Sequence, residues 1–120
     1  MRYFLLAAVL LASPASAFTA QNGLIVRPAG QADFTVGWRG MSDVSQFWCA
    51  AGDYGIRVLK LSPAVKIYRA SEPPRRAGEG IRFTLDPAQA ASSTGIAFFW
   101  PKGAAVTAGF AQSFCEERRR

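Results

Sequence analysis

Two adjacent arginines, Arg75 and Arg76, have the clearest potential for chemistry in this sequence. They follow two prolines and are flanked by Glu72 and Glu79 within a segment, 71–80, that also contains two glycines. Guanidinium groups are planar donors that suit phosphate and carboxylate ligands, and a stiff backbone lowers the entropy lost in holding them. The segment predicts either a binding loop formed by these four charged residues or a solvated hairpin loop whose charges pair with one another.

The two cysteines, Cys49 and Cys115, are the next candidates for chemistry. An even number of cysteines in an oxidising compartment predicts one disulfide, with two buried thiols as the alternative. Closing a loop of this length would stabilise the fold by about 4 kcal/mol in the chain-entropy model. A redox-active pair is not expected, because the chain has no Cys-x-x-Cys sequence and no basic residue beside either thiol.

The chain contains no histidine, which excludes several classes of site. Ser-His-Asp catalysis and haem attachment through Cys-x-x-Cys-His both require that residue. A zinc site would have to be built from carboxylates and two distant cysteines, which is not expected. Neither a Walker A sequence nor Gly-x-Gly-x-x-Gly is present. Asp53, with Asp43 or Glu72 as a second carboxylate, would be the only basis for an enzyme, and we predict no catalytic, cofactor-binding or metal-binding residue.

Residues 1–17 have the order of a secretory signal peptide. Arg2 precedes an apolar run over 3–12, and a proline and the small residues Ala-Ser-Ala follow. An N-terminal membrane anchor is the alternative, but the apolar run is much shorter than the roughly 20 residues that span a bilayer. We therefore expect cleavage after Ala17 and a mature protein, in the periplasm or secreted, that begins near Phe18.

The remaining chain, 18–120, is of a length typical of one domain. The whole chain has a net charge of +6, and the mature part keeps 13 basic against 8 acidic residues. In an exported protein this excess points to phospholipid headgroups, lipopolysaccharide or cell-wall polymers as anionic partners, and not to nucleic acid. No transmembrane segment is expected after cleavage of the signal.

Apolar periodicity predicts the secondary structure of the mature chain. A helix over 43–59 is favoured by apolar residues at three- and four-residue steps, although Gly52 and Gly55 each disfavour it by up to about 1 kcal/mol. A second helix covers 107–115, and a short helical turn follows Asp86. Strands are expected over 24–27, 34–38, 65–69, 81–85 and 96–100.

This order predicts an α+β fold of two layers: a mostly antiparallel sheet of about five strands with two helices on one face. The disulfide would then join the long helix to the C-terminal one. The aromatic residues are expected mainly in the core, with a platform for sugars or peptides as the alternative. They are Trp48, Tyr54, Phe98, Phe99 and Trp100.

The stretches 47–54 and 71–83 resemble segments of small exported bacterial proteins of uncharacterised function. The resemblance implies a bacterial envelope and no particular activity. Together, these patterns favour a non-enzymatic binding or accessory module whose partner is an envelope protein or an anionic envelope polymer. A carboxylate-based enzyme acting on cell-wall glycans and a secreted inhibitor with a rigid basic loop are the alternatives.

Overall fold

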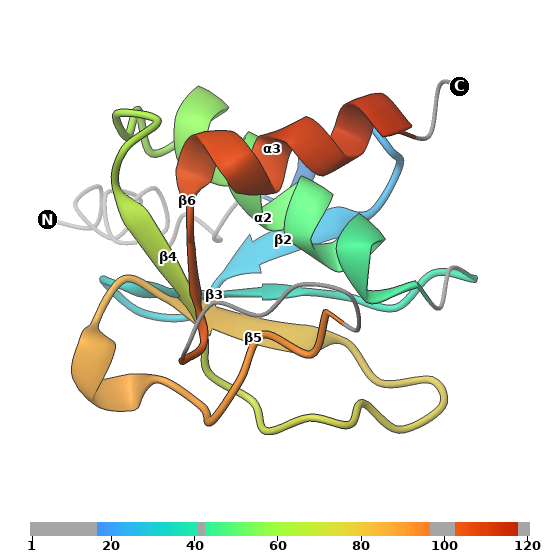
Figure 1. Cartoon of the computed structure of the whole chain (residues 1–120). Helices are drawn as coiled ribbons and strands as arrows, with labels where there is room; N and C mark the ends of the chain where they lie inside the picture. Colours follow the sequence, from blue (N-terminus) through green and yellow to red (C-terminus); the bar gives the residue numbers. More distant parts are fainter. Residues whose placement is uncertain (1–16, 41–42, 97–102, 118–120) are drawn as a thin grey trace, which may run out of the picture.

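An antiparallel sheet packs on one face against two helices in the computed structural model, which describes residues 17–40, 43–96 and 103–117 (Figure 1). In these residues the strand order is β1-β2-β3-β5-β4-β6. The predicted α+β class and antiparallel sheet are confirmed, with six strands where about five were expected. The strands are β1 (Phe18–Thr19), β2 (Ile25–Pro28), β3 (Asp33–Val36), β4 (Lys66–Arg69), β5 (Ile81–Thr84) and β6 (Ala105–Thr107); the helices are α2 (Val44–Arg57), α3 (Ala108–Glu117) and a short 3-10 helix, η2 (Pro87–Gln89).

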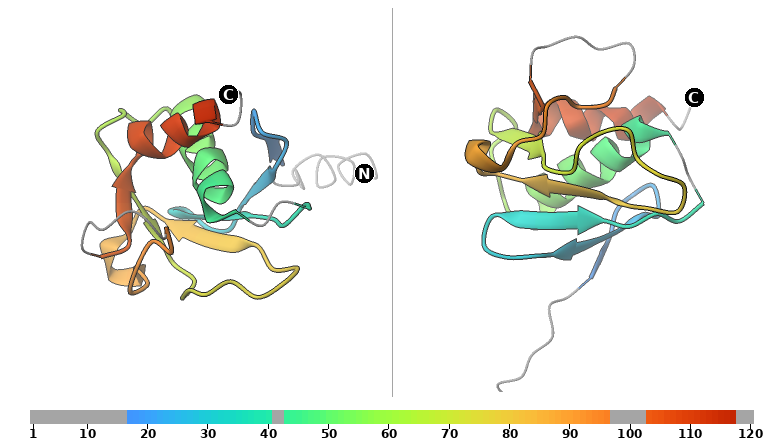
Figure 2. Two further views of the ribbon diagram at one scale, coloured as in Figure 1. Left: turned by 45° about the vertical axis from the view of Figure 1, so that its right-hand side comes forward. Right: turned by 90° about the horizontal axis from the view of Figure 1, so that it is seen from below.

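The strand register gives the sheet two chemically different faces. Residues paired directly across antiparallel strands lie on the same face, so Val26, Val36 and Ile81 share the face that is covered by the helices. The alternate residues form the opposite face, which lies in front of the helices when the molecule is seen from below (Figure 2, right). There β2, β3 and β5 are not covered by another layer of secondary structure.

Helix α2 runs without a break through both glycines that disfavoured it. Asp43 caps its first turn, because the Asp43 carboxylate accepts a hydrogen bond from the Ser45 N–H. Gly52 is needed where α3 crosses: a Cβ atom there would lie 2.8 Å from the Cβ of Ala111 and would overlap the backbone of Gln112. The penalty of a helical glycine is therefore offset by close packing between the two helices.

The predicted disulfide between Cys49 and Cys115 is confirmed. It joins α2 to α3 at a Cα–Cα distance of 4.9 Å, and both cysteines are buried. The crosslink and the close approach at Gly52 lie about one helical turn apart on α2. Together they fix the two helices against each other as one layer.

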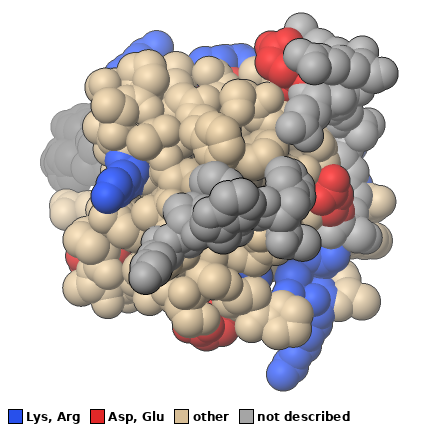
Figure 3. Space-filling model, in the orientation of Figure 1, with Lys and Arg blue, Asp and Glu red and all other residues tan. Residues whose placement is uncertain are grey.

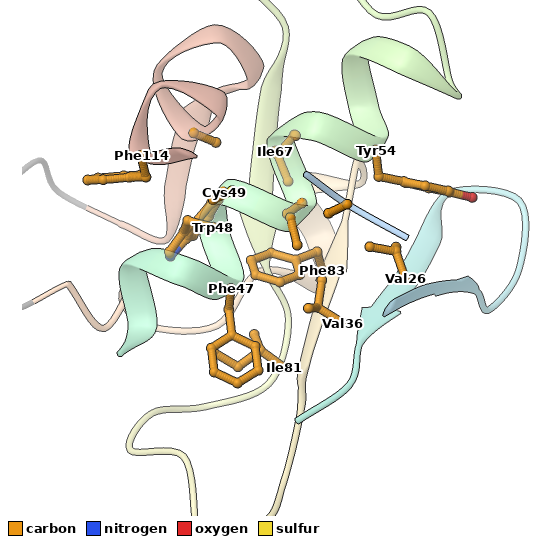
Figure 4. Packing of buried hydrophobic residues seen from close by; sticks show 14 of the residues in the cluster. Val26, Val36, Phe47, Trp48, Cys49, Tyr54, Ile67, Ile81, Phe83 and Phe114 are labelled. Carbon is orange, nitrogen blue, oxygen red and sulfur yellow. The ribbon is translucent and has the colours of Figure 1, made fainter. Parts of the chain in front are cut away.

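A core of large side chains fills the space between the helices and the sheet (Figure 4). Trp48 packs edge-on against Phe83, and Tyr54 contacts Phe34, with ring centroids 4.8 Å apart in both pairs. Trp48 and Tyr54 are thus core residues, as expected. The other three aromatics considered, at 98–100, lie outside the described residues.

Several predicted element boundaries were wrong. Trp38 was expected on the inner face of a strand, but β3 ends at Val36 and Trp38 is 45% exposed. Thr107 belongs to β6 and not to the C-terminal helix. The short strand β1 and the strand β6 were not expected, and most of the strand predicted over 96–100 lies outside the described residues. Within the part that the structure describes, no helix is both long and apolar enough to cross a membrane.

Replacing Gly52 with alanine should destabilise the fold by about 1–3 kcal/mol, because the new methyl group would meet the α3 backbone. Gly55 is the matched control. A Cβ atom there would meet only the side-chain ends of Ile67 and Leu61, both at 3.1 Å, which can move by a few tenths of an ångström. Urea unfolding should show a larger loss for Gly52→Ala than for Gly55→Ala. Equal losses would mean that the helix crossing does not depend on the missing side chain.

Candidate binding surface

Arg75 acts as an internal brace of the loop between β4 and β5. Its guanidinium lies over the buried ring of Phe47, 5.1 Å from the ring centroid, and one of its nitrogens donates to two carbonyls of the same loop. These bonds reach the carbonyl oxygens of Arg76 at 3.0 Å and of Glu79 at 2.8 Å. The side chain is half-buried, so it holds the loop in shape and covers the core.

Arg76 differs from Arg75: its side chain is exposed, and its backbone N–H and C=O groups are both hydrogen-bonded within the loop. Its N–H donates to the Glu79 carboxylate at 3.3 Å, and its carbonyl accepts from the Glu79 N–H at 3.0 Å and from Arg75. Gly78 has a φ of 82°, which closes this turn in a conformation that favours glycine. The loop therefore presents one cation, Arg76, on a backbone fixed by its neighbours.

Glu72, the fourth residue of the predicted loop, is also engaged within the protein. Its carboxylate accepts hydrogen bonds from the Ser92 hydroxyl at 2.6 Å and from the Ser92 N–H at 2.9 Å. The charged residues of the 71–80 segment are thus brought together only in part. Arg75, Arg76 and Glu79 form one interacting group, while Glu72 fastens the start of the loop to the following segment.

Arg69, a buried arginine at the end of β4, supports this loop from inside the protein. It is 1% exposed and donates to the carbonyls of Ser71 at 2.7 Å and Thr94 at 3.1 Å. Burial lowers the pKa of Arg69, the charge of Glu72 opposes that shift, and the charge of Arg75 adds to it. Arg69 was not among the predicted site residues: alternation predicted the strand over 65–69, but the contacts of its last side chain depend on Ser71 and Thr94.

Asp53, the carboxylate considered for acid–base chemistry, is entirely buried and surrounded by donors. It accepts hydrogen bonds from the backbone and side chain of Gln21, from Gln112 and from Arg57, with Arg57 Nη1 at 3.1 Å in an ion pair. These partners come from the β1–β2 turn and both helices. The arrangement suits a carboxylate that joins three elements, and it leaves no exposed face for a substrate.

A row of polar side chains crosses the open face of the sheet. Arg27 on β2 lies opposite Thr35 on β3, which in turn lies opposite Arg82 on β5. Two strand spacings separate the arginines, a Cα–Cα distance of about 10 Å. Both side chains are exposed and share this face with Asp33, whose carboxylate accepts from the Thr84 hydroxyl at 2.6 Å.

Several exposed arginines have no partner among the described residues. Among the described residues, the guanidinium groups of Arg27, Arg76 and Arg82 make no hydrogen bond or ion pair, and the single ion pair is the one between Arg57 and Asp53. The carboxylates, in contrast, accept hydrogen bonds from backbone or neutral groups. Those that do are Asp33, Asp43, Asp53, Glu72, Glu79 and Asp86.

Figure 3 shows where Lys and Arg side chains lie on one face of the molecule. Lys and Arg side chains gather at the lower right of the molecule, where the β4–β5 loop lies in Figure 1. We call the three exposed and unpartnered arginines of the described residues the basic surface: Arg27 and Arg82 in one row of the sheet, and Arg76 in the loop that leads into β5. Its geometry can hold phosphate or other oxyanion groups by charge-assisted hydrogen bonds. Within the described ranges, no group of three or more Cys, Asp or Glu residues could hold a metal ion.

Comparison with models of protein families, with curated proteins and with solved structures gave no match. Two of the three residues of the basic surface, Arg27 and Arg82, were not among the predicted site residues. The alternation in 81–85 did place Arg82 opposite to the inward Phe83, but only the strand register shows that Arg27 and Arg82 share one row.

The braced loop should resist trypsin in spite of its exposed arginine, because the protease requires an extended substrate backbone. Replacing Arg75 with alanine removes the hydrogen bonds to Arg76 and Glu79. Cleavage after Arg76 should then be about thirtyfold faster, since two lost bonds of about 1 kcal/mol each favour the open loop by about 2 kcal/mol. Mass spectrometry of the first fragments measures the site and its rate. Arg82→Thr is the control and should leave this rate unchanged; rapid cleavage of the loop in the wild type would contradict the brace.

Proposed function

We propose that this chain is an exported, non-enzymatic binding module that recognises phosphate groups of the cell envelope through the basic surface. The observation that supports the proposal is that most carboxylates have hydrogen-bond partners within the protein, whereas three exposed arginines have none in the described structure. Six carboxylates are occupied as caps and braces, while Arg27, Arg76 and Arg82 have no partner in the described structure. Guanidinium forks match phosphate geometry, so an anionic ligand is the natural partner of such a surface.

The two alternative functions have less support from the described residues. An inhibitor that fills a protease cleft presents an extended backbone whose N–H and C=O groups pair with the enzyme. Those groups of Arg76 are bonded inside the loop. A carboxylate-based enzyme needs an accessible acid, whereas Asp53 is buried among donors. The binding proposal requires only the exposed side chains that are present.

Export is supported by the way in which the fold uses its first described residues. Phe18, the expected first residue of the mature chain, pairs with Val26 at the edge of the sheet. Its ring packs 5.8 Å from that of Tyr54 and lies under the guanidinium of Arg57, at 5.1 Å. The disulfide is compatible with an oxidising compartment such as the periplasm. A cut after Ala17 would therefore leave β1 and these contacts of Phe18 in place.

Export and cleavage are tested by the mass of the protein made with its own leader in a bacterial host. Material from the periplasm should have the mass of residues 18–120 less two hydrogen atoms, as expected for one disulfide. Reduction and alkylation should then add two alkyl groups. An intact Met1 terminus on the periplasmic product, or no product in the periplasm, would contradict export with cleavage after Ala17.

Binding is tested with inorganic polyphosphate as the probe and titration calorimetry as the measurement. Each of Arg27→Thr, Arg76→Ser and Arg82→Thr should weaken binding about tenfold, because a charge-assisted hydrogen bond contributes about 1.5 kcal/mol or more. Threonine is chosen in the strands because β-branched residues are favoured there. The wild-type affinity should also fall as salt concentration rises.

Lys60→Asn is the matched control, since it removes one exposed positive charge beyond the end of α2. Lys60 has a φ of 60°, a conformation that asparagine tolerates. This variant should bind polyphosphate nearly as well as the wild type. The proposal fails if the three arginine variants bind as tightly as the wild type, or if Lys60→Asn loses as much affinity as they do.

A further inference from the structure

One end of the sheet combines an exposed tryptophan with arginines. The backbones of Val36, Gly37 and Gly80 are in contact there: a Cβ atom on Gly80 would lie 3.0 Å from the Gly37 Cα and would overlap the Val36 carbonyl oxygen. The chain that leaves β3 and the β4–β5 loop therefore emerge together. Figure 1 and the right panel of Figure 2 both show them projecting toward the same side.

Trp38 is held at this end by the residue that follows it. The Arg39 side chain is exposed, and one guanidinium nitrogen donates to the Gly23 carbonyl in the β1–β2 turn at 3.3 Å. This bond ties the chain after β3 to the neighbouring turn. Trp38 is the most exposed large apolar side chain among the described residues, although tryptophan is normally well buried.

From this combination we infer that the Trp38 end of the sheet docks on the interfacial region of an anionic lipid leaflet. The inference deepens the proposed function, on which it rests, by assigning the phosphate groups to lipid headgroups. Tryptophan concentrates at the headgroup level of membranes because its ring is apolar and its N–H is polar. Arg39 and Arg76 would contact lipid phosphates beside it, as basic residues do at anionic surfaces.

A soluble phosphate polymer accounts less well for the same features. Such a ligand needs the arginines but gains little from an exposed indole ring. A lipid leaflet can bind both the arginines and the indole ring, because its phosphate groups lie directly above its apolar layer. Two carboxylates of the neighbouring segments accept hydrogen bonds from backbone N–H groups: Asp43 from Ser45 at the start of α2, and Glu79 from Arg76.

Sedimentation of the mature protein with vesicles tests the assignment. Vesicles of phosphatidylcholine with phosphatidylglycerol should bind the protein, and vesicles of phosphatidylcholine alone should not. Trp38→Ala should lower partitioning several-fold, and Trp38→Phe should lower it less. Arg39→Ser and Arg76→Ser should each lower it about fivefold, the effect of one basic residue near an anionic leaflet. Phe110→Ala removes an aromatic side chain of similar exposure, 42%, from α3 and should have no effect.

Quenching by brominated phosphatidylglycerol gives a second measurement. Wild-type fluorescence should be quenched on binding, and Trp38→Phe should lose most of that quenching. The lipid assignment is overturned if Trp38→Ala binds the anionic vesicles like the wild type, or if quenching is the same in Trp38→Phe. If the protein binds polyphosphate but neither type of vesicle, the assignment fails and the proposed function stands. If it binds neither probe, both fail.

Discussion

The contact between α2 and α3 is the constraint on which the rest of this structure depends. The absence of a side chain at Gly52 lets the two helix backbones meet, and the disulfide between Cys49 and Cys115 holds them there. Asp53, next to that glycine, accepts hydrogen bonds from α3 and from the β1–β2 turn. The sheet can be open on one face because its other face is covered by a helix layer that is itself fixed.

Several carboxylates of the protein stabilise turns and helix ends by accepting hydrogen bonds from backbone N–H groups. A small domain has few buried side chains with which to satisfy the backbone groups of its turns and helix ends. Here carboxylates supply that need, as when Asp43 caps α2 and Asp86 accepts from the Ala88 N–H in η2. Each carboxylate used in this way is less available to neutralise a neighbouring arginine. The chain has more basic than acidic residues, and the fold uses several of its carboxylates at backbone N–H groups and not in ion pairs.

Much of the fold could be predicted from the sequence because its signals are local. Alternation identified the strands around Phe34, Ile67 and Phe83, and the even number of cysteines predicted the crosslink. The continuity of α2 was harder to predict, because the residues that require a glycine at position 52 belong to α3. Strand β1 has only two residues, too few for any periodic signal, and it exists because β2 offers an edge to pair with.

The candidate site was predicted only in part, for a related reason. The 71–80 segment was identified from its composition, but composition does not distinguish an arginine that braces a loop from one that is presented by it. Arg75 became the brace because Phe47 lies beneath it, and that contact joins residues 28 positions apart in the sequence. The row of Arg27 and Arg82 depends on strand register, which no single strand reveals.

The carbonyl oxygen of Thr94 accepts from both Trp48 and Arg69, at 3.2 and 3.1 Å. Arg69 also reaches Ser71, where the β4–β5 loop begins. The Thr94 oxygen thus links Trp48 of α2, through Arg69, to the first residue of the β4–β5 loop segment. A substitution that displaces Thr94 would therefore remove a hydrogen bond from the core tryptophan and one of the two carbonyl contacts of Arg69, so the helix layer and the start of this loop have a common point of attachment.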